Sequence, residues 1–176
     1  HQQRQAQLGS QTPLLKVEHL KTWFPIRKGL LGRTRDNVKA VDDVSFVVYP
    51  GETLGLVGES GCGKTTLGRS ILRLQEPSSG KVIYDGKDLT AMGSAGLRAL
   101  RKDVQIIFQD PYSSLNPRMP IGAAIQEPMT VHHIHANEQE RKQQTLQLLE
   151  RVGLHADHYD RYPHEFSGGQ RQRICI

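Results

Sequence analysis

The stretch GESGCGKT, from Gly58 to Thr65, decides the fold. It fills the pattern GxxxxGK[ST] with Gly58, Gly63, Lys64 and Thr65. It follows a short apolar run bounded by glycines, TLGLVG (53–58), which predicts a strand buried on both faces of a sheet. The residues that follow predict a helix starting near Lys64. A Gly-rich turn between a buried strand and a helix is typical of a phosphate-binding loop, or P-loop.

The residue types of this loop suit phosphate binding. Glycines let the backbone N–H groups point inward, and a helix N-terminus adds positive partial charge. We expect Lys64, a catalytic candidate, to reach the β- and γ-phosphates of a nucleotide, and the Thr65 hydroxyl to bind Mg²⁺. The residues predicted to contact the nucleotide are Gly58, Glu59, Ser60, Gly61, Cys62, Gly63, Lys64, Thr65 and Thr66. A chance Gly-rich turn is the alternative, which the strand and helix signals disfavour.

A second motif, FSGGQ (166–170), lies near the end of the chain. Ser167 is a candidate N-cap, two glycines permit close backbone approach, and RQRICI continues as a helix. Alone, a Ser-Gly-Gly triplet is more often a flexible turn. A P-loop alone does not distinguish kinases, GTPases, helicases, DNA-repair ATPases and transporters, so the second motif matters.

Three segments together resemble those of ABC ATPases. They are GESGCGKTT, FQDPYSSLNPR with Gln109, and YPHEFSGGQRQRI, in this order and separation. The resemblance covers about residues 14–176 and points to the branch that serves importers of oligopeptides, dipeptides and glutathione, the glutathione importers in particular. It implies an α/β fold of the P-loop NTPase class. The expected domain is an ABC-type nucleotide-binding domain, with a RecA-like core and antiparallel β and helical subdomains, and it is expected to be incomplete.

The resemblance also implies a division of the chain. Residues 1–13 are Gln-rich and read as a linker or disordered tail. We expect 14–109 to hold the β subdomain and the P-loop core. Residues 110–166 would form the helical subdomain that docks a coupling helix of a permease, and 167–176 would begin the signature helix.

Patterning places the individual elements. Alternation predicts strands at 14–21, 39–51 and 81–86, with a long basic loop at 25–37 and a second buried strand in VQIIF (104–108). LRALRK (97–102) reads as helical. Asn137 with Glu140 predicts a helix start, and Gly153 predicts its end.

The resemblance assigns further roles to single residues. Ser167, Gly168, Gly169 and Gln170 would contact the γ-phosphate of ATP held on a partner subunit, with Phe166 in the place where such motifs usually have Leu. Gln109 would act as the Q-loop glutamine, a catalytic and metal candidate that contacts Mg²⁺ or the attacking water.

An aromatic residue is also expected at the adenine. Phe24 resembles the residue that stacks on the base, Trp23 is the neighbouring candidate, and Val41 would pack beneath the same ring. An aromatic at a strand end is as often part of the core.

The implied function is the ATP-binding and ATP-hydrolysing subunit of an ABC importer for dipeptides, oligopeptides or glutathione, using ATP and Mg²⁺. Its partners would be a second ABC ATPase domain, two transmembrane permease subunits and, indirectly, a solute-binding protein. It would lie peripherally on the cytoplasmic face of the bacterial inner membrane. A nucleotide-binding remnant without hydrolysis and a non-transport ABC ATPase are the alternatives. A P-loop kinase or GTPase is disfavoured by SGGQ and by the absence of NKxD.

Composition sets the remaining bounds. The 176 residues are 36% hydrophobic and 23% charged, with a formal net charge of +5, which fits a globular domain. Basic residues are scattered among acidic ones, so no nucleic-acid partner is expected. Two cysteines and the HHIH run (132–135) predict no metal site, and His164 is assigned no catalysis.

Both ends of the chain look cut. The first residue is His, and RQRICI stops without a polar tail. We expect a strand ending in Asp-Glu, the D-loop and a switch histidine to follow Ile176. Without them the chain could not complete hydrolysis.

Overall fold

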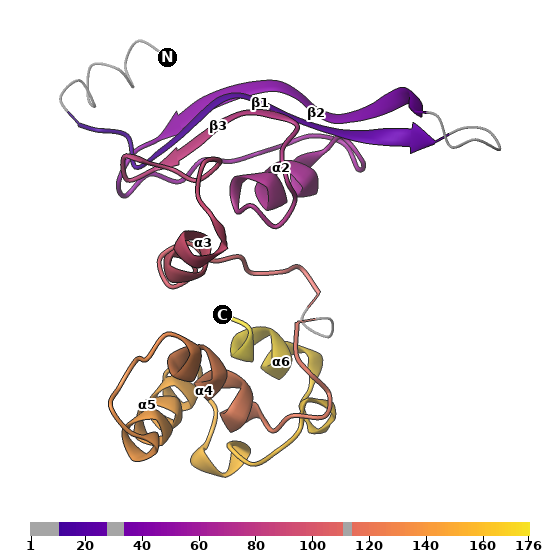
Figure 1. Ribbon diagram of the computed structural model, residues 1–176. Coiled ribbons are helices and arrows are strands. Elements are labelled where there is room, and N and C mark those ends of the chain that lie inside the picture. The colour runs from indigo at the N-terminus through magenta and orange to yellow at the C-terminus, as the bar shows by residue number, and fades with distance from the viewer. Residues whose placement is uncertain (1–10, 28–33, 111–113) are drawn as a thin grey trace. The chain divides into compact units, whose positions relative to one another are not determined.

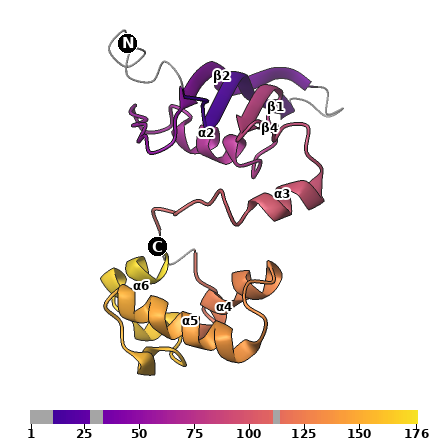
Figure 2. The same ribbon diagram turned by 90° about the vertical axis from the view of Figure 1, so that its left-hand side faces the viewer.

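The computed structural model describes residues 11–27, 34–110 and 114–176. The chain divides into two compact units, His1–Arg101 and Lys102–Ile176, which we call the sheet unit and the helical unit and describe separately (Figures 1 and 2). Within the described ranges, no helix combines the length and the apolar character needed to span a bilayer.

An antiparallel sheet with a helix on one face forms the sheet unit (Figure 1). Its strands are β1 (Leu15–Arg27), β2 (Thr34–Val48), β3 (Ser79–Tyr84) and β4 (Lys87–Asp88), in the order β2-β1-β3-β4. The helices are α2 (Lys64–Ile71), which contacts β1 and β2, and α3 (Ser94–Leu100). Apolar side chains from the strands and from α2 make the core, among them Val17, Leu20, Val41, Leu67 and Val82. The three strands predicted from alternation are confirmed.

The β1–β2 hairpin is longer than the sequence indicates. Pro25 pairs with Asn37 and Ile26 with Asp36, so the predicted basic loop at 25–37 was wrong at both ends. Charge and a proline argued for a loop there, yet two antiparallel neighbours satisfy each other's backbone groups whatever their side chains. Residues 28–33 of that loop lie outside the described residues.

A bulge in the hairpin keeps the core residues of β1 on one face. Val17 and Leu20 are both buried although three residues apart, a spacing that would put them on opposite faces of a regular strand. The register shifts between them, and His19 adopts φ +47° opposite Asp43 at φ +60°. The Nδ1 atom of His19 lies 2.7 Å from Oδ1 of Asp43, and the His19 amide donates to Ser45 Oγ at 2.8 Å. These bonds offset the cost of two left-handed residues.

Two predicted buried strands do not form. Residues 53–58 and 104–108 are irregular, and most of their apolar side chains are exposed, Val57 by 91% and Ile107 by 63%. A strand exists only where a neighbour accepts and donates its backbone hydrogen bonds. No described segment pairs with either run, so the apolar pattern alone was not sufficient.

The helical unit packs short helices around a small core. Its helices are α4 (Ile121–Val131), α5 (Glu138–Arg151) and α6 (Gly168–Ile174), with 3-10 turns η1 (Ala156–His158) and η2 (Pro163–Glu165). The buried residues Ile121, Leu149, Leu154 and Phe166 form one cluster. The first amides of α4 donate to the η1–η2 connection: Ile121 to the Arg161 carbonyl at 2.9 Å and Gly122 to the Tyr159 carbonyl at 2.8 Å.

Both predicted ends of α5 are confirmed. The Asn137 side chain accepts from the Glu140 amide at 2.9 Å, which caps the first turn. Gly153 adopts φ +72°, and the amides of Gly153 and Leu154 donate to the Glu150 and Leu149 carbonyls, both at 2.9 Å. This pairing is the Schellman arrangement, and the buried contact of Leu154 with Leu149 accompanies it.

The His19–Asp43 pair predicts a pH dependence. The hydrogen bond from His19 lowers the pKa of the Asp43 carboxyl, with smaller help from the charges of His19 and Lys21. A lowered folded-state pKa stabilises the fold above the unfolded value of about 3.9, and this stabilisation is lost as pH falls through the folded value. Asp43→Asn tolerates the left-handed backbone but removes the charge. At pH 6 we expect the variant to unfold at a lower urea concentration than the wild type. The difference between the two unfolding midpoints should disappear towards pH 2. An equal gap at both pH values would contradict the assignment.

Candidate nucleotide-binding site

The P-loop joins an irregular segment to α2. The Cys62 amide donates to the Glu59 carbonyl at 3.4 Å, which closes a turn over Ser60 and Gly61. Gly61 and Gly63 adopt φ +82° and +93°, a region that glycine enters without strain. Gly63 is the N-cap of α2, which begins at Lys64 as predicted.

Gly63 presses directly on β2. A Cβ atom at this position would lie 2.0 Å from the Ala40 carbonyl oxygen and 3.9 Å from Cγ2 of Val41. The oxygen belongs to backbone and cannot turn aside, so only glycine fits. Val41, only 4% exposed, therefore lies beside the P-loop, at the place where the sequence expected part of the nucleotide site.

The Lys64 amine is folded back into the loop. Its Nζ atom donates to the Gly58 carbonyl at 2.7 Å and the Glu59 carbonyl at 2.6 Å, and Cys62 Sγ lies 3.7 Å away. The loop thus surrounds this ammonium with oxygen atoms. Phosphate oxygens are stronger acceptors of the same kind, so the amine is placed to exchange one set for the other.

A buried hydrogen bond holds α2 on the sheet. Ser70, fully buried, lies with its Oγ 2.8 Å from Oγ1 of Thr22 in β1, and Leu67 is buried beside it. The first turn of α2 carries Thr65, which is exposed, and Thr66, which is half-buried. The position of α2 is therefore fixed, and the positive end of its helix dipole lies at the P-loop.

Trp23 and Phe24 lie on opposite faces of the hairpin. Thr22 faces α2, so by alternation Phe24 faces that side and Trp23 the other. The Trp23 indole N–H donates to Asp42 Oδ1 at 3.1 Å, and the Lys39 ammonium lies 4.7 Å from the ring centre. Phe24 is 37% exposed and pairs with Val38, itself 52% exposed.

FSGGQ begins α6 and is capped by its own side chains. The Gln170 amide donates to Ser167 Oγ at 3.3 Å, and the Ser167 amide donates to Gln170 Oε1 at 2.9 Å. The predicted N-cap role of Ser167 is confirmed. Phe166 is 4% exposed, while Gly168 and Gly169 are exposed, so the motif has one anchored end and one open turn.

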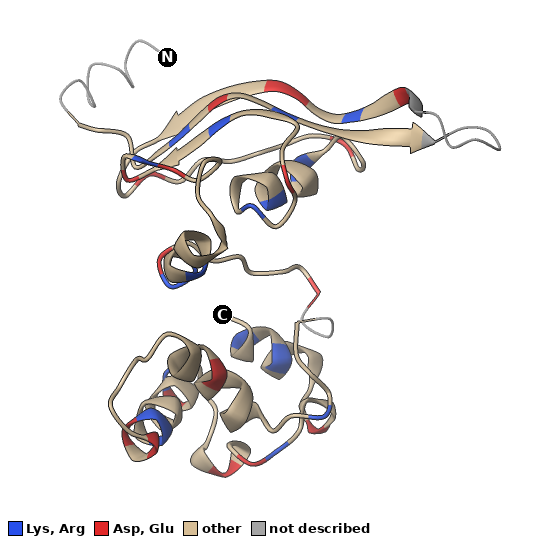
Figure 3. Ribbon diagram, viewed as in Figure 1, with Lys and Arg blue, Asp and Glu red and all other residues tan. Residues whose placement is uncertain are grey.

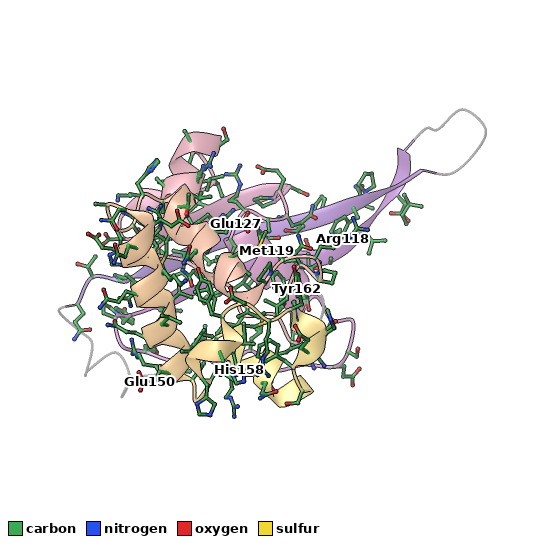
Figure 4. All side chains as sticks on the ribbon, turned by 90° about the horizontal axis from the view of Figure 1, so that it is seen from below. Arg118, Met119, Glu127, Glu150, His158 and Tyr162 are labelled. Atoms are coloured by element: carbon green, nitrogen blue, oxygen red, sulfur yellow. The ribbon has the colours of Figure 1, made fainter. Side chains whose placement is uncertain are left out.

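The sequence reasoning missed two buried polar residues beside this motif. His158, labelled in Figure 4 with Tyr162, accepts the His155 amide on Nδ1 at 3.0 Å and packs edge-on against Phe166. Arg171 is 6% exposed and reaches back to η2. The signal available in the sequence was the place of Arg171 about one helical turn after the N-cap candidate Ser167.

The remaining candidate residues lie outside the sequences of these two motifs. Gln109 is exposed on irregular backbone in the helical unit, next to the undescribed residues 111–113. The histidines of HHIH connect α4 and α5, where His133 and His135 have positive φ. In the described part of the chain, no three His, Cys, Asp or Glu residues gather at metal-binding distance.

Charged residues on the sheet are interleaved by sign, as Figure 3 shows. Lys16 pairs with Glu18 at 2.5 Å, and Lys39 pairs with Asp42 at 3.3 Å. The bond from Lys16 lowers the pKa of the Glu18 carboxyl. Exposed pairs of this kind contribute little stability.

The close approach at Gly63 predicts a difference between two glycine variants. Gly63→Ala meets the Ala40 carbonyl, whereas Gly61→Ala meets nothing within 4 Å and has only the cost of its positive φ, about 1 kcal/mol. We expect Gly63→Ala to lose nucleotide binding and to lower the thermal midpoint, and Gly61→Ala to keep most of both. Titration with a fluorescent nucleotide and a thermal melt measure the two effects. Equal losses in the two variants would show that the Ala40 contact is unimportant.

Comparison with known sequences identifies the family of the chain. The sequence model of the ABC transporter family matches residues 41–176. The chain is 54% identical over 164 residues to the glutathione import ATP-binding protein GsiA of Pectobacterium atrosepticum and to that of Escherichia coli strain K12. In each case the match covers 93% of this chain and 26% of the relative. The chain therefore spans about a quarter of the length of the curated relatives it matches.

Solved structures share the fold. The dimeric ATP-binding cassette MJ0796, in a post-hydrolysis state bound to ADP and Pi, has a TM-score of 0.77 at 24% identity, covering 92% of this chain and 66% of that chain. The cassette cbiO1 of Clostridium perfringens, part of the complex cbiONQ, has a TM-score of 0.67 at 26% identity, covering 93% and 59%. The predicted P-loop NTPase fold of the ABC type is confirmed. With the family model matching most of its length, this nucleotide-binding chain belongs to the ABC transporter family.

Proposed function

We propose that this chain forms part of the ATP-binding subunit of an ABC importer that energises uptake of dipeptides, oligopeptides or glutathione. The P-loop is the observation that carries the proposal. Gly63 fits closely against β2, and the Lys64 amine lies among inward carbonyl oxygens at the start of α2. The identity to glutathione import ATP-binding proteins supports the substrate class.

Each P-loop residue has a chemical task in this proposal. Lys64 exchanges its two carbonyl partners for the β- and γ-phosphate oxygens of ATP, and the loop amides and the α2 dipole hold the remaining charge. Thr65 suits a magnesium ion, because it offers an exposed hydroxyl on the first turn of α2. When bound, this ion would neutralise charge on the phosphates.

The adenine base is assigned to the Phe24 side of the hairpin. Phe24 and Val38 present paired apolar side chains on the face that also carries Thr22 and Val41. Trp23 is occupied on the other face by Asp42 and Lys39. A flat base needs an accessible ring face, which Phe24 has.

The helical unit supplies the contacts to partners. Ser167, Gly168, Gly169 and Gln170 contact the γ-phosphate of ATP on a second ABC ATPase domain, so two domains enclose two nucleotides. A groove of about 720 Å³ runs between α4, α5 and α6, with Met119 and Glu127 on its wall (Figure 4). Its mostly apolar lining supports docking of an amphipathic coupling helix from one of two permease subunits, at the cytoplasmic face of the membrane. The solute-binding protein acts through that permease.

The role of Lys64 is tested by substitution. Lys64→Ala removes the ammonium that would contact the phosphates, and Arg69→Ala removes one positive charge from the exposed side of the same helix. We expect Lys64→Ala to weaken ATP binding about a hundredfold, since two charge-assisted hydrogen bonds are lost, and Arg69→Ala to change it less than about twofold. Equilibrium dialysis with labelled ATP measures both.

The importer role requires a second measurement. In the protein at its full genomic length, Lys64→Ala should abolish ATP hydrolysis and glutathione or peptide uptake together. Binding without hydrolysis in the full-length wild type would identify a nucleotide-binding remnant. Hydrolysis with no uptake of any peptide or of glutathione would indicate a non-transport ATPase.

The assignment of the base is tested by comparing the two aromatic neighbours. Phe24→Ala should raise the Kd for ATP and for ADP about tenfold, because stacking is worth about 1–3 kcal/mol. Trp23→Phe, on the opposite face, should leave both nearly unchanged. Tripolyphosphate has no base, so its inhibition of ATP binding should be the same in the wild type and in both variants. A larger loss in Trp23→Phe than in Phe24→Ala would reverse the assignment.

A further inference from the structure

We infer that Arg171 is a positioning residue that sets the shape of the FSGGQ turn, and this inference rests on the proposed contact between that turn and a partner's nucleotide. Arg171 lies one turn into α6 and is 6% exposed, whereas Arg173 on the same helix is exposed. A buried guanidinium is costly unless it is hydrogen-bonded, so its contacts identify what it holds.

The guanidinium holds the residue that begins η2. Nη1 of Arg171 donates to the Pro163 carbonyl at 3.0 Å in a buried hydrogen bond. The same carbonyl accepts the Phe166 amide at 3.3 Å. Pro163 therefore joins the residue just before the open turn to a residue just after it, through one oxygen atom.

Two further contacts hold the residues on either side of the FSGGQ turn. The Arg171 amide donates to the Ser167 carbonyl at 3.0 Å, and Phe166 is fixed by the core cluster. The exposed glycines between them have nothing within 4 Å of a Cβ position. Gly168 and Gly169 thus have no packing of their own to fix them, and the flanking contacts determine where their amides point.

A lysine cannot reproduce this clamp. The planar guanidinium presents several N–H groups in a fixed fork, while an ammonium is a single, strongly hydrated point. Lys at 171 keeps the charge and most of the apolar stem, so it preserves packing but loosens the link to Pro163. The Arg171→Lys substitution should therefore change the geometry of the turn without changing the stability of the helical unit.

The first experiment is amide hydrogen exchange on Arg171→Lys, with Arg173→Lys as the matched control. We expect exchange of the Phe166 and Gln170 amides, which donate to the Pro163 carbonyl and to Ser167 Oγ, to accelerate about tenfold in Arg171→Lys, while the amide of Leu149 in α5 is unchanged, because only the turn is released. Arg173→Lys should change neither. If α5 accelerates as much as the turn, Arg171 only stabilises the unit and the inference is overturned.

The second experiment uses the protein at its full genomic length. Arg171→Lys should lower kcat for ATP hydrolysis about tenfold or more with less than about a twofold change in KM, since misplacement of the turn affects the closed state rather than binding at the P-loop. Arg173→Lys should match the wild type. A normal kcat in Arg171→Lys overturns the inference.

A signature variant separates this result from failure of the proposed function. Ser167→Arg places a large side chain in the open turn and should abolish hydrolysis if the turn meets a nucleotide. If Ser167→Arg abolishes ATP hydrolysis while Arg171→Lys keeps a normal kcat, only the positioning role of Arg171 is refuted. Normal hydrolysis in Ser167→Arg would refute the proposed contact of the turn, and the inference with it.

Discussion

The contact between Gly63 and the carbonyl of Ala40 fixes the geometry of the nucleotide site. At this point the P-loop backbone and β2 approach more closely than any side chain would permit. The Thr22–Ser70 hydrogen bond holds α2 to β1 a short distance away. Together these contacts attach both the P-loop and α2 to the β1–β2 hairpin. A P-loop is usually described by the buried strand that precedes it, whereas here the antiparallel sheet positions the loop. We therefore expect substitutions in the hairpin to change nucleotide binding through backbone position.

The parts of the site that depend on local chemistry were predictable. GESGCGKT indicated a turn before a helix at Lys64, and the Asn137 and Gly153 caps are each decided within a few residues of chain. The Ser167 cap is of the same kind. Features decided by distant neighbours were not predictable. The apolar runs at 53–58 and 104–108 looked like strands because their composition suits a sheet, but pairing depends on segments elsewhere.

The adenine candidates illustrate the same limit at the scale of one residue. Trp23 and Phe24 are adjacent aromatic residues, and no pattern in the sequence separates them. The pairing register of β1 and β2 decides what each aromatic residue contacts. Thr22 pairs with Val41, and the next residue, Trp23, pairs with Lys39, so Ala40 is an extra, unpaired residue of a bulge in β2. That bulge puts Lys39 and Trp23 on one face and leaves Phe24 with Val38 on the other. The buried role of Arg171 was hidden for a similar reason, since it contacts the backbone carbonyl of Pro163.

The exposed run VQIIF has a consequence for the behaviour of the chain in solution. It carries no charge, no proline and no glycine, and Ile107 and Phe108 are 63% and 42% exposed. Its backbone groups are unpaired with any strand in the described residues, and its residues favour extended structure. Short uncharged segments of this kind pair readily with copies of themselves and begin aggregates. We therefore expect solubility at high concentration to depend on whether this segment and the exposed run at 53–58 are covered.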